Sequence, residues 1–259
     1  MEISRHTRDE ISSYLRRVVY DKLKAYQPET VHAPFQHRLL GRDRYAMFSL
    51  IQSMNTTFGM SIWEQLSVIL AKGVNNWAQR KFRLIGSIDE DTERLIATIH
   101  LRLRKRELLS NVDDETEQIR TQIQQMPPRT NDPDRTVDFY TKVAEVEYYF
   151  DITSVKPNMK EFSALKLKLL RWKALRLSQE KNVQIQTRLA IPYNPYHPEP
   201  YERWTLSGLF DLPNGEVMVA EEYWNFVGQG NIYLELLDIF QEVGEELRDD
   251  IDRKFAEFR

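Results

Sequence analysis

The chain has 259 residues, 41% of them hydrophobic and 29% charged, which is the composition of a globular protein able to form a sizeable core. It contains no cysteine, which excludes disulfides, thiolate metal sites and cysteine nucleophiles, and its formal net charge of −3 is not the basic balance of many nucleic-acid-binding proteins. No apolar run approaches the ~20 residues that cross a bilayer, and the first residues lack the pattern of a signal peptide, so we expect a cytoplasmic protein that does not contact a membrane.

Apolar residues at helical spacing predict five helices in the first half of the chain. Thr7 and Glu10 have the spacing of a capping box and indicate where the first helix begins. Gly59 is expected to separate the second helix from the third. The second to fifth helices are expected over residues 43–54, 61–72, 89–109 and 113–125.

The second half of the chain changes to a strand pattern after a proline-rich break at residues 126–134. Residues rich in Val, Tyr, Phe, Ile and Thr predict two pairing strands, and a third strand follows a helix that opens with Asn158 and Glu161 at capping-box spacing. A loop rich in Pro and Tyr and further helices complete the chain. The strands are expected over residues 136–143, 145–155 and 183–191, the loop over residues 191–204, a strand turning into helix over residues 216–227 and a final helix over residues 232–258.

This order of elements predicts an α+β protein. Residues 1–125 are expected to form a helical region that contributes to the core. Residues 126–259 are expected to form a strand–strand–helix–strand core with C-terminal helices. The two regions together are expected to make one compact domain.

Two aspartates stand out on the predicted strands. Asp138 lies between Val137 and Phe139, and Asp151 is likewise flanked by apolar residues. Aspartate is disfavoured in strands, and two on adjacent strands repel when directly opposed. If the two strands pair and bring these carboxylates together, the carboxylates can hold a divalent metal ion for phosphodiester hydrolysis. The alternative is that both aspartates lie on the solvent face of amphipathic strands.

Four segments of the chain resemble a known family of enzymes. The segments are YFDITSVKPN (149–158) with LKLKLLRW (165–172), NTTFGMSIWEQ (55–65), YNPYHPEPYERW (193–204) and VAEEYWNFVG (219–228). They resemble TdeIII-like type II restriction endonucleases of the PD-(D/E)xK nuclease superfamily, over most of the chain beyond about residue 35. The resemblance implies a restriction-endonuclease-like α+β core, Mg²⁺ as cofactor, and cleavage of double-stranded DNA at a short palindromic site such as GGNCC or GGWCC.

The resemblance also implies roles for particular acids. Asp138 and Asp151 would hold Mg²⁺, and Glu64 would be an additional acid at the site. The competing interpretation of Glu64 is a capping-box partner of Ser61. Glu161 is a further candidate ligand, although a role in capping its own helix is the stronger interpretation.

The chain departs from the family pattern at one catalytic position. The family has lysine two residues after the strand acid, whereas this chain has Thr153. Lys156 or Lys142 would have to replace that lysine, or the site is impaired. We favour Lys156, which a bulge or the turn at Pro157 would have to direct toward Asp151.

A palindromic site is read most simply by a twofold-symmetric protein, so a homodimer is expected. Residues 160–181 contain seven basic and two acidic residues, and residues 242–259 seven acidic and four basic, so charge is segregated along the chain. Either segment alone can also be a solvated helix face. The residues expected to contact phosphates are Lys160, Lys166, Lys168, Arg171 and Lys173, with Arg102, Arg104, Lys105 and Arg106 as further candidates. Those expected to read bases are Asn194, His197 and Arg203.

Two other functions are compatible with the sequence. A DNA-binding protein of the same fold that has lost catalysis would explain Thr153. A non-enzymatic helical interaction protein would explain the net charge of −3.

Overall fold

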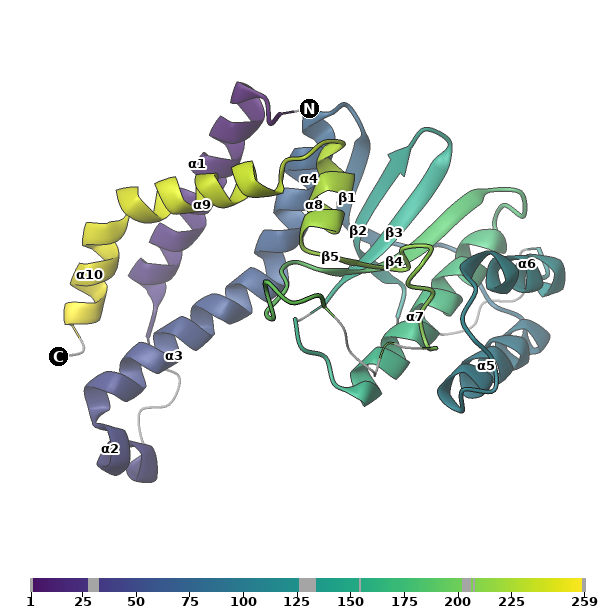
Figure 1. Cartoon of the computed structure of the whole chain (residues 1–259), viewed down its shortest axis with the longest axis horizontal. Coiled ribbons are helices and arrows are strands. Elements are labelled where there is room, and N and C mark those ends of the chain that lie inside the picture. Colours follow the sequence, from purple (N-terminus) through teal and green to yellow (C-terminus); the bar gives the residue numbers. More distant parts are fainter. Residues whose placement is uncertain are drawn as a thin grey trace.

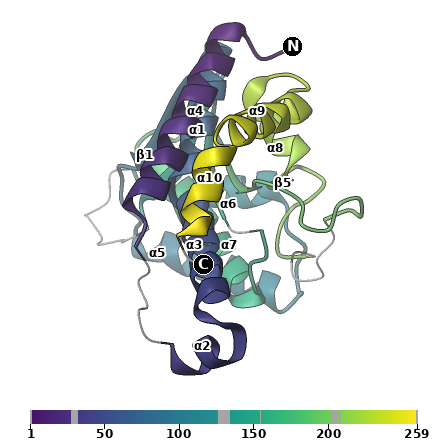
Figure 2. The same cartoon turned by 90° about the vertical axis from the view of Figure 1, so that its left-hand side faces the viewer.

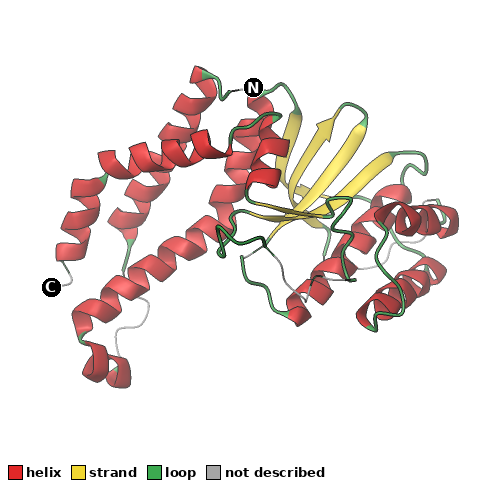
Figure 3. Cartoon of the chain, in the orientation of Figure 1, coloured by secondary structure: helices red, strands yellow, loops and turns green. Residues whose placement is uncertain are grey.

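The computed structural model describes residues 2–27, 33–125, 134–153, 155–201, 206 and 208–257. Within these residues the centre of the molecule is a mixed five-stranded sheet whose strands lie side by side in chain order (Figure 1, Figure 3). The strands are β1 (Trp77–Arg83), β2 (Thr136–Val143), β3 (Val146–Ile152), β4 (Gln184–Ile191) and β5 (Val217–Val219). The first three pair antiparallel, and β3, β4 and β5 pair parallel.

Helices cover both faces of the sheet (Figure 1). Along β3, Tyr149 belongs to the hydrophobic core on one face and Phe150 to the core on the other, because successive side chains on a strand alternate. The first core is completed by α5 (Glu90–Arg104), α6 (Val112–Gln122) and α7 (Met159–Leu177), and the second by α4 (Trp63–Gly73) and α8 (Glu221–Gly228). Helix α7 connects β3 to β4, which is the crossover that a parallel pair requires.

The remaining helices extend away from the sheet as an arm (Figure 1, Figure 2). The arm consists of α1 (Arg5–Ala25), α2 (Pro34–Leu40), α3 (Arg42–Thr57), α9 (Tyr233–Glu246) and α10 (Arg248–Ala256). Ion pairs of Arg8 with Glu235 and of Arg16 with Glu246 tie α1 to α9, so the two ends of the chain are held together. Helix α2 lies at the end of the arm farthest from the sheet.

The predicted α+β class with a mainly helical first half is confirmed, and the strand predicted over residues 136–143 is β2 to the residue. The division of the chain at residue 125 stays a prediction. The predicted proline-rich break lies, apart from residue 134, outside the described residues. No helix within the described ranges is long and apolar enough to cross a membrane.

Three details of the prediction are corrected by the structure. The first helix begins at Arg5 with Ser4 as its cap, one turn before Thr7. Gly59 does not separate two helices, because α3 continues into α4 through the π-helical segment η1 (Phe58–Ile62). The final helix is divided at Leu247 into α9 and α10.

Candidate active site at the ends of β2 and β3

Asp138 and Asp151 lie opposite each other where β2 and β3 separate. The last paired residues are Phe139 and Phe150, and the register continued by one residue sets Asp138 against Asp151. There, Oδ2 of Asp138 accepts a hydrogen bond from the backbone N–H of Ile152 at 3.0 Å. The carboxylate thus fills the gap that opens between the strands. Apolar side chains cover both faces of the sheet and Asp151 is only 4% exposed, so the alternative that both aspartates lie on a solvent face is wrong.

Glu64 and Lys81 adjoin Asp138 from α4 and β1. The ammonium nitrogen of Lys81 lies 2.5 Å from Oε1 of Glu64 and 2.9 Å from Oδ1 of Asp138. Glu64 is only 2% exposed, and Arg80 Nε lies 3.6 Å from its other oxygen. Lys81 has φ of +49°, a strained conformation for a residue with a Cβ, and such strain is often found at functional sites. The capping-box interpretation of Glu64 is wrong, because the helix runs on through Ser61.

Lys168 from α7 approaches Asp151 from the opposite side. Its ammonium nitrogen lies 2.6 Å from Oδ2 of Asp151 and 3.5 Å from Oδ1 of Asp134. The same nitrogen lies 4.9 Å from the ring centroid of Trp172, one helical turn farther on, so the lysine stem runs along the indole. An ammonium group therefore stands beside the strand acid even though Thr153 replaces the lysine of the family pattern.

The start of α7 fixes the direction of this helix. The side chain of Asn158 accepts hydrogen bonds from the backbone N–H groups of Lys160 and Glu161, and the carboxylate of Glu161 accepts one from the backbone N–H of Asn158. The predicted capping box is confirmed, and Glu161 caps its own helix. A cap of this kind holds the first turn, from which Lys168 is two turns away.

Burial sets the charge balance of the site. Burial raises the pKa of Asp151 above its ordinary value; the Lys168 ammonium opposes this rise, and the negative charge of Asp138 adds to it. Burial likewise raises the pKa of Glu64, against the Lys81 ammonium. For Lys168, burial alone would lower the pKa, but the carboxylate of Asp151 raises it above the usual value. Neighbouring acids and bases whose pKa values are shifted by burial and by one another's charge are typical of functional sites.

The carboxylates fit a divalent cation. Oε2 of Glu64 and Oδ2 of Asp151 are both buried without a hydrogen-bond donor, so their negative charge is met by ion pairs alone. Within the described ranges no three acidic or histidine side chains stand close enough to share one ion, and Lys81 and Lys168 pair with the acids of the site. Mg²⁺ keeps several waters and needs only one or two carboxylates, so Asp138 and Asp151 are sufficient ligands.

The other two candidate lysines lie elsewhere. The ammonium of Lys156 stands 5.1 Å from the ring centroid of Tyr196. Lys142 pairs with Glu145 in the turn at the far end of β2. Thr153 donates its backbone N–H to the carbonyl of Ala190, which continues the pairing of β3 with β4. None of these contacts brings either lysine to Asp151.

The prediction that Lys166 and Lys173 contact DNA phosphates is corrected by the structure. Both side chains are 0% exposed. The ammonium of Lys166 lies 2.7 Å from a carboxylate oxygen of Glu115 on α6 and 2.6 Å from one of Glu216 before β5, whereas that of Lys173 lies 3.6 Å from Glu115. These two lysines of α7 therefore balance buried acids rather than facing solvent.

Replacement of Lys166 by methionine is expected to destabilise the protein by about 3–5 kcal/mol, because it leaves two carboxylates buried without their main partner. Lys160→Met on the same helix is the matched control, since Lys160 is exposed, and a change within about 0.5 kcal/mol is expected. Urea unfolding of both variants measures the difference. Equal stability of the two would contradict the role assigned to the buried cluster.

For the remaining residues, contact with DNA stays a prediction. Lys160 is exposed, and Arg171 forms a hydrogen-bonded ion pair with Glu93 on α5. The amide of Asn194 donates to the carbonyl of Glu199 and its oxygen accepts from the N–H of Tyr196, so it stabilises its own loop. Arg203 lies outside the described residues.

Two lysines of the candidate site were not singled out from the sequence as partners of its acids. Lys81 lies on β1, a strand that was not predicted because its sequence WAQRKFR is largely polar. Lys168 was assigned to phosphate contact. Its position four residues before Trp172 places the two on one helix face but gives no sign of an acidic partner.

The chain is similar to type II restriction enzymes along almost its whole length. The family model described as "Type II restriction endonuclease, HinfI" matches residues 2–244. The type II restriction enzymes HgiEI and HgiBI of Herpetosiphon aurantiacus are each 24% identical over 284 aligned residues, with 99% of this chain and 100% of the relative covered. HgiCII of the same organism is 23% identical, with 98% and 99% covered. No solved structure matches the chain.

Proposed function

Since the chain belongs to the HinfI family of type II restriction endonucleases and so is a DNA-cleaving enzyme, we propose that it cuts a short palindromic site by metal-assisted phosphodiester hydrolysis. The family membership confirms the resemblance to type II restriction endonucleases, although the matching model is that of HinfI and not a TdeIII-like one. It also agrees with the restriction-endonuclease-like α+β core and argues against a non-enzymatic interaction protein.

The observation that carries the proposed mechanism is the cluster of Asp138, Asp151 and Glu64 with two lysines between them. Asp138 and Asp151 would hold Mg²⁺, with Glu64 as a further acid beside Asp138. The bound ion would neutralise charge on the scissile phosphate and activate a water molecule. In the reaction the water oxygen bonds to phosphorus, the bond from phosphorus to one sugar oxygen breaks, and that oxygen takes up a proton.

Lys168 is proposed to take the role of the lysine that Thr153 replaces. Its ammonium is already within 2.6 Å of Asp151, and the carboxylates around it keep it protonated. A fixed ammonium can orient the attacking water and stabilise negative charge that develops on the phosphate. Lys81 is proposed to position Glu64 and Asp138, since it contacts both. Lys156 stays the alternative for the catalytic lysine.

The proposed enzyme is a homodimer, because a palindrome presents the same contacts twice about a twofold axis. The arm carries exposed apolar side chains on α2 and α3, among them Phe35 at 84% and Leu39 at 83%, which is unusual for a surface that faces only water. A second copy of the chain is the proposed partner for this surface. Sedimentation at a mass near 30.8 kDa with DNA-cleaving activity intact would contradict the dimer.

Digestion of a plasmid of known sequence by the purified protein tests the proposal. With Mg²⁺ we expect a fixed set of fragments whose ends map to one palindrome, with GGNCC or GGWCC as the first sequences to examine, and no cutting with EDTA. Sequence-specific binding without cleavage in any divalent metal would favour the catalytically impaired alternative instead. Cleavage that persists in EDTA would contradict the metal mechanism.

A further inference from the structure

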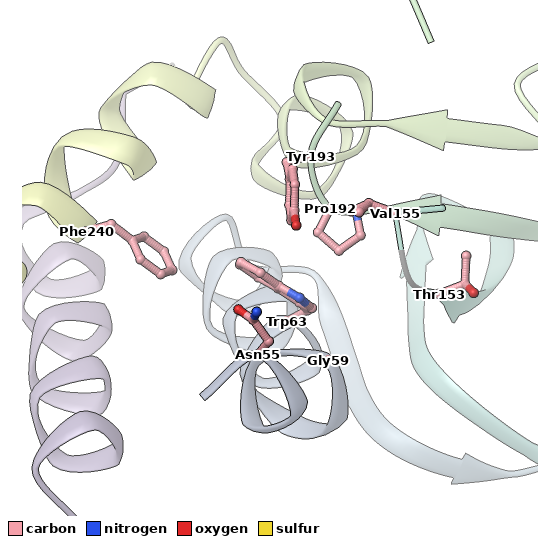
Figure 4. Close-up of a pocket in the computed structure, with 8 residues that line it drawn as sticks. All are labelled: Asn55, Gly59, Trp63, Thr153, Val155, Pro192, Tyr193 and Phe240. Atoms are coloured by element: carbon pink, nitrogen blue, oxygen red, sulfur yellow. The ribbon is translucent and has the colours of Figure 1, made fainter. Parts of the chain in front are cut away.

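A cavity of about 420 Å³ lies between the arm and the ends of β3 and β4 (Figure 4). Three aromatic side chains line it from separate elements: Trp63 at the start of α4, Tyr193 after β4 and Phe240 on α9. Asn55 on α3 adds a carboxamide, and Thr153 after β3 forms part of the wall opposite Phe240 (Figure 4). Figure 4 shows the three rings approaching one space from different directions. The cavity therefore offers flat apolar surfaces together with a few polar groups.

Two residues that line the cavity adjoin acids of the candidate active site along the chain. Trp63 directly precedes Glu64, and Thr153 follows Asp151 by two residues, about 7 Å along a strand. A group that enters this cavity consequently contacts residues that are one or two positions from Glu64 and Asp151 in the chain. The cavity itself is separate from the acids, because the carboxylates of Asp138, Asp151 and Glu64 do not line it.

The backbone at one wall is irregular in a way that keeps the cavity open. The π-helical segment η1 interrupts the continuous helix from α3 to α4, and such turns are rare and found often at functional sites. Gly59 lies in this segment and lines the cavity. A Cβ added at Gly59 would meet no atom within 4 Å, so the glycine leaves space where a side chain would project.

We propose that this cavity receives a single nucleobase of the DNA substrate, rotated out of the duplex beside the scissile phosphate. The inference rests on the proposed function. A nucleobase has the flat π-face that stacks on aromatic side chains and a polar edge that hydrogen-bonds to a carboxamide. The carboxamide of Asn55 forms no hydrogen bond with any other described residue, so it is available for that edge. Thr153, in place of the family's lysine, leaves the wall toward β3 uncharged.

The test uses the cost of unpairing a base. A mismatched base needs less energy to leave the duplex, so a mismatch at the rotated position should tighten binding. On the site mapped by the plasmid digest, with Ca²⁺ in place of Mg²⁺, duplexes carrying one mismatch at each position are compared with the matched duplex. For the wild-type protein, we expect one position to bind about tenfold tighter or more.

Gly59→Leu should abolish this gain, because it adds a bulky side chain at a residue that lines the cavity, where an added Cβ meets no atom within 4 Å. Gly244→Leu is the matched control: Gly244 is also helical with no atom within 4 Å of an added Cβ, and it does not line the cavity, so the gain should remain. Tyr193→Ala, at a ring that is 46% exposed, should reduce the gain without affecting folding.

The outcomes separate this inference from the function on which it rests. A wild-type protein that cuts the plasmid but shows no mismatch position with tighter binding overturns the nucleobase cavity alone. Full retention of the gain in both Gly59→Leu and Tyr193→Ala overturns it as well. A wild-type protein that cuts no DNA under any condition removes the proposed function and the cavity's occupant together.

Discussion

Asp151→Asn and Asp138→Asn are each expected to lower the rate of DNA cleavage by on the order of 10³-fold or more, because several kcal/mol of transition-state stabilisation would be lost with the metal ion. Asparagine keeps the shape of aspartate and removes the charge. The Lys168 ammonium that pairs with Asp151 keeps Asp134 at 3.5 Å, so the Asp151→Asn variant does not leave this lysine without an acidic neighbour. Single-turnover cleavage of the mapped site measures the rate, and urea unfolding shows that the variants remain folded.

Asp134→Asn provides the matched control for the aspartate variants. Asp134 lies 3.5 Å from the same Lys168 but precedes β2 and is more than half exposed. Its replacement should leave the rate within about threefold of the wild type, since a solvent-exposed ion pair contributes little. Cleavage by Asp138→Asn and Asp151→Asn at the wild-type rate would refute the assignment of both acids as metal ligands.

The predicted strands are correct where local chemistry determines them. Residues 136–143 are rich in β-branched and aromatic side chains, residues 184–191 alternate polar and apolar side chains, and both segments form strands. Strand β1 was not predicted because it lies at the edge of the sheet and pairs with one neighbour only. An edge strand tolerates polar side chains and an exposed Trp77, so its sequence lacks the apolar pattern of a strand. Its place beside β2 depends on contacts with residues 60 positions away, which a local pattern does not contain.

The candidate acids could be identified from the sequence, but the lysines that pair with them could not. Asp138 and Asp151 are conspicuous because each interrupts an apolar strand. The basic residues of α7 show no such contrast, since Lys166, Lys168 and Lys173 look alike in composition. Only the packing of α7 distinguishes them: two balance buried carboxylates of α6 and the segment before β5, and one reaches Asp151. A basic helix in sequence therefore does not by itself indicate a DNA-binding surface.

Lys168→Ala should separate the two candidate catalytic lysines. We expect it to lower the single-turnover cleavage rate by on the order of 10²–10³-fold, the usual effect of removing one group that stabilises transition-state charge. Lys156→Ala is the matched control and should remain within about twofold, because the Lys156 ammonium stacks on Tyr196 and not on the acids. The reverse order of effects would return the catalytic role to Lys156.

The pH dependence of the residual activity shows whether Lys168 acts through Asp151. Burial raises the pKa of Asp151 and the Lys168 ammonium lowers it, so removal of the ammonium raises that pKa further. Asp151 must be ionised to hold a metal ion, and a higher pKa means that it ionises only at higher pH. The acidic limb of the rate profile should consequently move to higher pH in Lys168→Ala and stay in place in Lys156→Ala. An unmoved limb in Lys168→Ala, together with a full loss of rate, would place the lysine's effect on the substrate and not on the carboxylate.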